Sequence, residues 1–190
     1  MAFGAAARTT LIDGTSLFPA PPIRAMLQHQ RGRNMAILDI LWPTFALVAL
    51  VFAVWFTLFF QRMSHMRRNP PRADDFVNGE AALRYFRPVE MPANNLANLF
   101  EMPVLYFALV PLLILTAQAN YIQVTLAWLF VLARVIHSFI HIGPKKVQWR
   151  FFAYLVSTAL LMAMWIGFFV DIVRAASEYH RVMDAMGGVL

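Results

Sequence analysis

Residues 40–60 read ILWPTFALVALVFAVWFTLFF, a run of 21 residues without a charged side chain. A helix needs about 20 mostly apolar residues to cross the hydrocarbon core of a bilayer. Residues 151–170 form another run of 20 with the same character. Both runs are continuous and do not alternate between apolar and polar residues, so they predict membrane-spanning helices rather than strands.

A longer apolar stretch lies between these two runs. Residues 102–133 carry no charge, and they are too many for a single span. The polar sequence Gln118-Ala119-Asn120 interrupts them, which predicts two helices, at about residues 93–117 and 121–142, joined by a tight turn. The predicted fold class is therefore all-α: an integral membrane bundle of four transmembrane helices.

The overall composition agrees with a membrane protein. Hydrophobic residues make up 60% of the 190-residue chain and charged residues 14%, against roughly 25% charged residues in an ordinary soluble domain. A soluble domain of this size could not hide so much apolar surface, and a disordered chain would be far more polar. The net charge of +6 resembles that of a nucleic-acid-binding protein, but the arginines flank the apolar runs. We therefore expect membrane lipids as partners and no nucleic acid.

Prolines and glycines mark the predicted helix ends and bends. Pro43 fits the first turn of the first helix. Pro103 and Pro111 fall inside the second helix, where each removes a backbone hydrogen bond and should bend it. Gly143-Pro144 is expected to end the third helix.

Two terminal segments lie outside the predicted bundle. Residues 1–34 have no apolar run long enough for a signal peptide, so they are expected to form an extension outside the bundle, with Met26 and Met35 as alternative starts. Residues 35–175 are predicted to form the membrane domain, and residues 176–190 a C-terminal tail.

Basic residues predict the orientation, because cytoplasmic loops carry an excess of Lys and Arg. The first and third loops share one side of the membrane and carry Arg62, Arg67, Arg68, Arg72, Arg84, Arg87, Lys145, Lys146 and Arg150. The other side carries Arg8, Arg24, Arg31, Arg33, Arg174 and Arg181. This bias places the two loops in the cytoplasm and both termini in the periplasm, and we expect a bacterial inner membrane.

Polar side chains recur at helical spacing in the second and third helices, where they are costly and usually functional. On the second helix three share one face, at i, i+4 and i+7: Asn94, Asn98 and Glu101. On the third helix three share one face, at i, i+3 and i+7: Arg134, His137 and His141. The two helices form an antiparallel hairpin, and Arg150 begins the fourth helix at the same edge. We predict one polar site near the cytoplasmic face.

A purely structural interpretation of part of this cluster stays open. Glu101 and Arg134 could form a buried ion pair that only fixes the register of two helices, and Asn98 could simply bond a neighbouring helix. The convergence of six polar residues at one depth favours a binding site instead.

Two stretches resemble the MAPEG family, the membrane-associated proteins of eicosanoid and glutathione metabolism. Residues 94–103, NNLANLFEMP, are similar to the family pattern R-x-x-x-N-x-x-E-x-x-P. Residues 133–141, ARVIHSFIH, are similar to A-R-x-x-H-x-x-x-Y, and Arg150 has the spacing of the family's thiol-activating arginine. The resemblance covers about residues 35–175.

The resemblance implies a homotrimer that binds glutathione as co-substrate between neighbouring subunits. Arg150 would be catalytic, because a nearby guanidinium lowers the pKa of a thiol and the thiolate is the nucleophile. The implied glutathione-binding residues are Asn94, Asn98, Glu101, Arg134, His137, His141 and, as a weaker candidate, Arg62. Glu101 would take the amino end of the tripeptide. The implied activity is that of a membrane transferase or peroxidase acting on lipophilic electrophiles.

Three positions depart from the family pattern. Asn94 stands where the family has an arginine, so one anion-binding charge is missing. His141 replaces the tyrosine, and Pro103 follows Glu101 by two residues instead of three. The missing arginine bears most directly on the glutathione prediction.

Other functions compete with this one. A non-catalytic MAPEG-like scaffold, or an accessory subunit of a larger membrane complex, would use residues 1–34 as a docking arm. A haem or metal protein would use His137 and His141, with His65 as the other available ligand, but we expect no metal. The absence of cysteine excludes disulfides, Cys-ligated metal sites and a protein thiol nucleophile. A channel or transporter is disfavoured because no inverted repeat is present.

Overall fold

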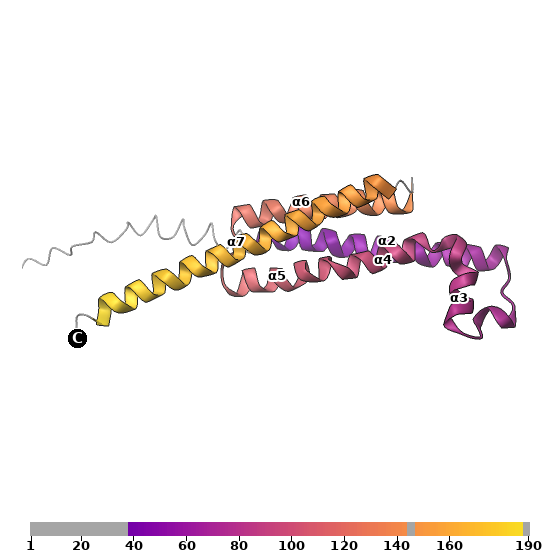
Figure 1. Cartoon of the computed structure of the whole chain (residues 1–190), viewed down its shortest axis with the longest axis horizontal. Coiled ribbons are helices and arrows are strands. Elements are labelled where there is room, and N and C mark those ends of the chain that lie inside the picture. The colour runs from indigo at the N-terminus through magenta and orange to yellow at the C-terminus, as the bar shows by residue number, and fades with distance from the viewer. Residues whose placement is uncertain (1–37, 144–146, 188–190) are drawn as a thin grey trace, which may run out of the picture.

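A computed structural model describes residues 38–143 and 147–187 of the chain (Figure 1). Its elements are α2 (Leu41–Arg68), η1 (Ala73–Phe76), α3 (Gly79–Phe86), η2 (Arg87–Val89), α4 (Met91–Glu101), α5 (Pro103–Leu115), α6 (Tyr121–Ile142) and α7 (Val147–Gly187). Four stretches are long and apolar enough to cross a membrane, namely α2, α4 with α5, α6 and α7. The predicted all-α bundle of four transmembrane helices is confirmed.

The four long helices lie side by side along the long axis of the molecule (Figure 1). The start of α2, the α5–α6 turn and the end of α7 lie toward one side, which we call the terminal end. The helix α3 and the start of α7 lie toward the other side, the loop end. The first and third loops therefore share one end of the bundle, as predicted. The most extensive contact is between the antiparallel helices α6 and α7.

Helix ends agree with the predicted spans where the sequence carries a break. The predicted third helix, residues 121–142, coincides with α6, and Gly143 caps it. The predicted fourth helix ended at residue 170, whereas α7 continues to Gly187. Residues 171–186 contain neither glycine nor proline, so nothing in the backbone stops the helix where the apolar run ends. The predicted boundary at residue 175 consequently falls inside a continuous helix. Residues 1–34 lie outside the described residues.

Of the two prolines predicted to bend the second transmembrane helix, Pro103 coincides with a break. The helix divides at Met102 into α4 and α5, with Pro103 as the first residue of α5. Pro103 cannot donate a backbone hydrogen bond to the preceding turn, which explains the break. Pro111 lies inside α5 and leaves that helix continuous. Pro144 lies outside the described residues.

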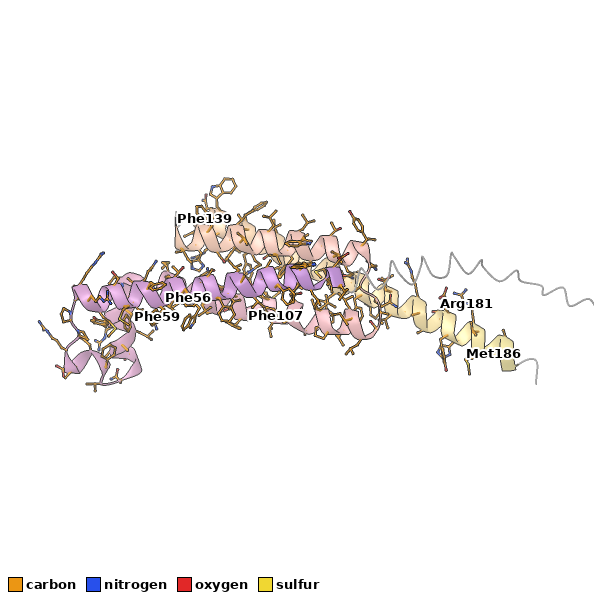
Figure 2. The ribbon with its side chains drawn as sticks, turned by 180° about the vertical axis from the view of Figure 1, so that it is seen from behind. Phe56, Phe59, Phe107, Phe139, Arg181 and Met186 are labelled. Carbon is orange, nitrogen blue, oxygen red and sulfur yellow. The ribbon has the colours of Figure 1, made fainter. Side chains whose placement is uncertain are left out.

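The core joins apolar side chains from all four long helices. Its members are Ile40, Leu47, Tyr106, Leu109, Val110, Leu113, Ala119, Ala127, Phe130, Val131, Leu161 and Met164. Tyr106 stacks on Phe130 with ring centroids 5.1 Å apart, and its hydroxyl lies 3.0 Å from the Thr44 hydroxyl. Large apolar side chains also cover the outside, among them Phe56 and Phe139, which Figure 2 labels. This outer surface is suited to lipid contact.

A polar contact at the terminal end fixes the α6–α7 pair. The buried Gln123 side chain on α6 donates from Nε2 to the Met164 carbonyl on α7, at 3.0 Å. Asn120 accepts from the Gln123 backbone and donates to Asp171, at 3.0 and 2.9 Å. A Cβ atom at Gly167 would lie 3.0 Å from Gln123 Nε2. Gly167 therefore allows the two helices to approach closely enough for the Gln123 bond.

Replacing Gly167 with leucine should destabilise the bundle. The new side chain would displace the Gln123 amide from the Met164 carbonyl and overpack the helix contact, at a cost of about 1–3 kcal/mol. Thermal unfolding in detergent measures the effect. Gly187→Leu is the matched control. Gly187 lies on the same helix, and a Cβ atom there would have no neighbour within 4 Å. Equal unfolding temperatures for the two variants would contradict this account of the α6–α7 contact.

Candidate functional site

A fully buried arginine lies between α4 and α6. Arg134 is 0% exposed, and its Nη2 donates to the Asn98 carbonyl at 2.7 Å. Its Nε and Nη1 atoms have no hydrogen-bond partner among the described residues. The register-fixing ion pair with Glu101 is therefore not formed, and Asn98 takes part through its backbone. Arg134 is thus held by one hydrogen bond to a carbonyl, and two of its three nitrogens have no partner among the described residues.

Two histidines follow Arg134 on the same face of α6. The rings of His137 and His141 are both buried and approach edge to face, with centroids 5.6 Å apart. His137 Nδ1 lies 3.2 Å from the Arg150 carbonyl. A carbonyl can only accept, so this nitrogen carries the proton and Nε2 of a neutral ring is a free acceptor. Neither His137 Nε2 nor His141 Nδ1 has a partner among the described residues.

A buried amide, that of Asn95, adjoins these groups, and the sequence pattern does not identify it. Asn95 on α4 is 0% exposed, and its Oδ1 accepts a hydrogen bond from Ser138 Oγ at 3.3 Å. Its Nδ2 has no partner in the described part of the chain. The available signal was weak, because Asn95 stands next to Asn94 and matches no position of the family pattern. Asn95 and Ser138 connect α4 to α6 beside the site.

The polar side chains surround a cavity of about 400 Å³ between α4, the end of α6 and the start of α7. It is lined by Asn94, Asn98, His137, His141, Val147, Arg150, Phe151 and Tyr154. Its volume falls within the range of roughly 300–1,000 Å³ that is usual for small-molecule sites. Five of the predicted site residues therefore share one cavity, and Arg134 lies buried beside it.

Tyr154 is a lining residue that the sequence pattern does not single out. Its ring lies 5.9 Å from the His137 ring, and the Arg134 guanidinium carbon lies 5.9 Å from its centroid. The spacing of four residues from Arg150 places both side chains on one face of α7. That spacing is the signal that could have identified Tyr154.

Two predicted site residues lie elsewhere in the single chain. Glu101 is exposed and does not line the cavity. Arg62 on α2 stacks over the Phe86 ring at 4.7 Å and borders a separate hollow of about 200 Å³. Arg62 Nε is buried and has no partner among the described residues. A single subunit thus unites most of the predicted site but leaves Glu101 and Arg62 outside it.

The structure gives the metal hypothesis no additional ligand near the two histidines of α6. His65 contacts Tyr85 instead, with ring centroids 4.9 Å apart, in the region of the first loop. Within residues 38–143 and 147–187, no group of three or more His, Cys, Asp or Glu side chains is placed to hold a metal ion.

The chemistry of the cavity is that of an anion-binding, hydrogen-bonding site. Among the described residues that line it there is no carboxylate, whereas there are one guanidinium, two amides and two imidazoles. Charged groups in a low-dielectric site need partners of opposite charge. Val147 and Phe151 add apolar walls where α7 begins. The cavity can therefore hold an anionic, hydrophilic molecule beside the apolar surface of the bundle.

Comparison with known proteins identifies one family. A sequence model of the MAPEG family matches residues 40–170. No individual curated protein and no solved structure gives a match. The matched region includes every residue that lines the cavity and stops before the last 17 residues of α7, 171–187.

The two neighbouring asparagines of α4 should differ in their effect on the stability of the protein. Asn95→Ala removes the acceptor of the buried Ser138 hydroxyl, and we expect it to lower the free energy of unfolding by about 1–2 kcal/mol. Asn94 is exposed and lines the cavity, so Asn94→Ala should change stability by less than about 0.5 kcal/mol. Thermal unfolding of both variants in the same detergent tests this. A larger loss for Asn94→Ala would refute the assignment.

Proposed function

Because the chain belongs to the MAPEG family, we propose that it is a membrane glutathione-dependent transferase or peroxidase acting on lipophilic electrophiles. The family resemblance inferred from residues 94–103 and 133–141 is confirmed by the match. Membership supports a glutathione-related membrane role in general. The observation that carries the more specific proposal is the cavity in which Arg150, His137 and Asn98 converge, with no carboxylate among the lining residues that the structure describes.

The lining groups suit the polar parts of glutathione. The tripeptide carries two carboxylates, which require donors, and its peptide groups require both donors and acceptors. The Asn94 and Asn98 amides supply both, and the imidazoles of His137 and His141 add further sites. Arg134 contributes positive charge from beside the cavity. These groups compensate in part for the arginine that Asn94 replaces.

Arg150 is proposed to stabilise the glutathione thiolate. Arginine stays protonated and presents several donors, so its proximity favours the charged form of a thiol. The thiol would lose its proton to water. The thiolate would then attack an electrophilic carbon of the second substrate, forming a carbon–sulfur bond while the leaving group departs with the electron pair. Val147 and Phe151 provide the apolar side on which such a substrate could approach.

The proposal includes a homotrimer whose neighbouring subunits complete the site. Glu101 and Arg62 lie outside the cavity of one chain, yet both are polar groups on membrane-length helices. Packing between copies is the arrangement that would bring Glu101 toward the amino group of glutathione. Arg62 would then be available to a glutathione carboxylate from the adjoining subunit.

The orientation inferred from the basic loops belongs to the same proposal. The cavity lies at the loop end, between α4 and the start of α7. In a bacterial inner membrane with cytoplasmic loops and periplasmic termini, it would open toward cytoplasmic glutathione. Lipophilic electrophiles would reach it from the bilayer.

Replacing Arg150 should abolish most of the conjugating activity. We expect Arg150→Ala to lower kcat about 10²-fold, the usual loss on removing one preorganised donor from a developing anion. Conjugation of glutathione to a chlorinated nitrobenzene by the purified protein measures the rate, and calorimetry measures glutathione binding. Arg174→Ala is the matched control, because Arg174 is exposed on the same helix and outside the cavity. Unchanged turnover in Arg150→Ala would remove this residue from the mechanism.

The calorimetric measurement also separates the two candidate functions. If the Arg150→Ala variant loses turnover but still binds glutathione, the result would support the hypothesis of an enzyme. No binding to the unmodified protein would favour the non-catalytic scaffold or accessory subunit.

Glu101 should affect binding through the amino group of glutathione alone. We expect Glu101→Gln to weaken glutathione binding about tenfold, because an ion pair becomes a neutral hydrogen bond. The same substitution should leave the affinity for an analogue without the α-amino group unchanged, which a double-mutant cycle by calorimetry would reveal. An equal loss for both ligands would show that Glu101 does not contact the amino group.

A further inference from the structure

Helix α7 is much longer than the membrane requires. Its 41 residues correspond to a length of about 60 Å, whereas the hydrocarbon core of a bilayer is about 30 Å thick. Figure 1 shows its C-terminal part projecting past the other helices at the terminal end. Figure 2 labels Arg181 and Met186 on this projecting part. Asp171 still contacts the bundle through Asn120, and residues 172–187 form a helical arm beyond this contact.

The arm is amphipathic. We call its apolar face the α7 stripe; it consists of Ile172, Ala175, Ala176, Tyr179, Val182, Met183 and Met186. These positions repeat the spacing i, i+3, i+4, i+7, which places them on one side of a helix. The opposite side carries Arg174, Ser177, Arg181 and Asp184, together with one exposed apolar residue, Val173. A helical arm surrounded by water would gain no stability from gathering its apolar side chains on one face.

The α7 stripe continues the core-facing side of α7. Inside the bundle, Leu161 and Met164 are buried, and Phe168 packs against the same core. Steps of three and four residues lead from these positions to Ile172 and on to Met186 without a break in the helical face. Beyond the bundle the face becomes exposed, with Tyr179 at 63%, Val182 at 56% and Met186 at 55%. The core-facing side therefore extends past the elements that cover it.

We propose that residues 1–37 of the same chain pack on the α7 stripe. They join the bundle at the terminal end, because Ile40, three residues after this stretch, is buried in the core cluster that contains Met164. A short covalent connection to that point gives a high effective concentration at the stripe. The segment also contains apolar residues that could cover the stripe, including Leu11, Leu17 and Ile23.

The covalent tether favours this occupant over the alternatives. Residues 1–37 contain four arginines and one aspartate, and residues 172–187 contain two acidic and two basic side chains, so charge does not oppose the contact. Lipid is disfavoured because the arm extends the axis of a membrane-spanning helix beyond the span. A second copy would have to compete with a segment that is already tethered.

Thiol chemistry tests the proposal in a chain that has no cysteine of its own. Val182→Cys places a thiol on the α7 stripe, and Ser177→Cys places one on the opposite face as the matched control. In the full-length protein in lipid nanodiscs, we expect maleimide to label Val182→Cys at least about tenfold more slowly. Pairing Val182→Cys with Leu11→Cys, Leu17→Cys or Ile23→Cys should give a bismaleimide cross-link within one chain, and the Ser177→Cys pairs should not.

Each alternative outcome has a distinct result. Equal labelling of the two single-cysteine variants would overturn the proposal, since the α7 stripe would then be uncovered. Slow labelling with cross-links only between chains would show that a second copy covers it, which also overturns the proposal. Slow labelling without any cross-link to residues 1–37 would show that lipid or another protein covers the stripe, and this result would also overturn the proposal. None of these results depends on glutathione binding.

Discussion

The bond from Arg134 to the Asn98 carbonyl is the interaction on which the loop end of the molecule depends. A guanidinium inside a membrane costs about 2.5–3.5 kcal/mol on insertion scales, so it persists only where acceptors are at hand. Asn98 lies in the last turn of α4, and its backbone carbonyl accepts the hydrogen bond from Arg134 Nη2. That bond holds α4 against α6 and sets the position of His137.

The transmembrane spans were predictable because lipid imposes a simple length and polarity requirement on each one. The true helix ends were predictable only where the backbone changes, as at Gly143 after α6 and Pro103 at the start of α5. Hydropathy describes the surroundings of a helix and not its continuity. For this reason the change to polar residues after residue 170 marked the end of the apolar span correctly but not the end of α7.

The site was predictable in part, because helical spacing shows which residues share a face but not which neighbour that face meets. On α6 the spacing of Arg134, His137 and His141 coincides with the buried side. On α4 the buried side is formed by Pro92, Asn95 and Leu99. Asn94 and Asn98 therefore flank the packed side and line the cavity, while Glu101 turns outward. Helical spacing does not identify Asn95, because its role depends on packing against Ser138.

The two ends of the α6–α7 pair use buried polar groups differently. At the terminal end, Asn120 bonds both the Gln123 backbone and Asp171, and the Gln123 amide reaches the Met164 carbonyl. At the loop end, Arg134 and both α6 histidines keep nitrogens without partners among the described residues. Unpaired donors and acceptors in an apolar setting lower stability, so their grouping around one cavity is typical of a binding site. The terminal end holds the helices together, and the loop end retains the hydrogen-bonding capacity that a charged ligand requires.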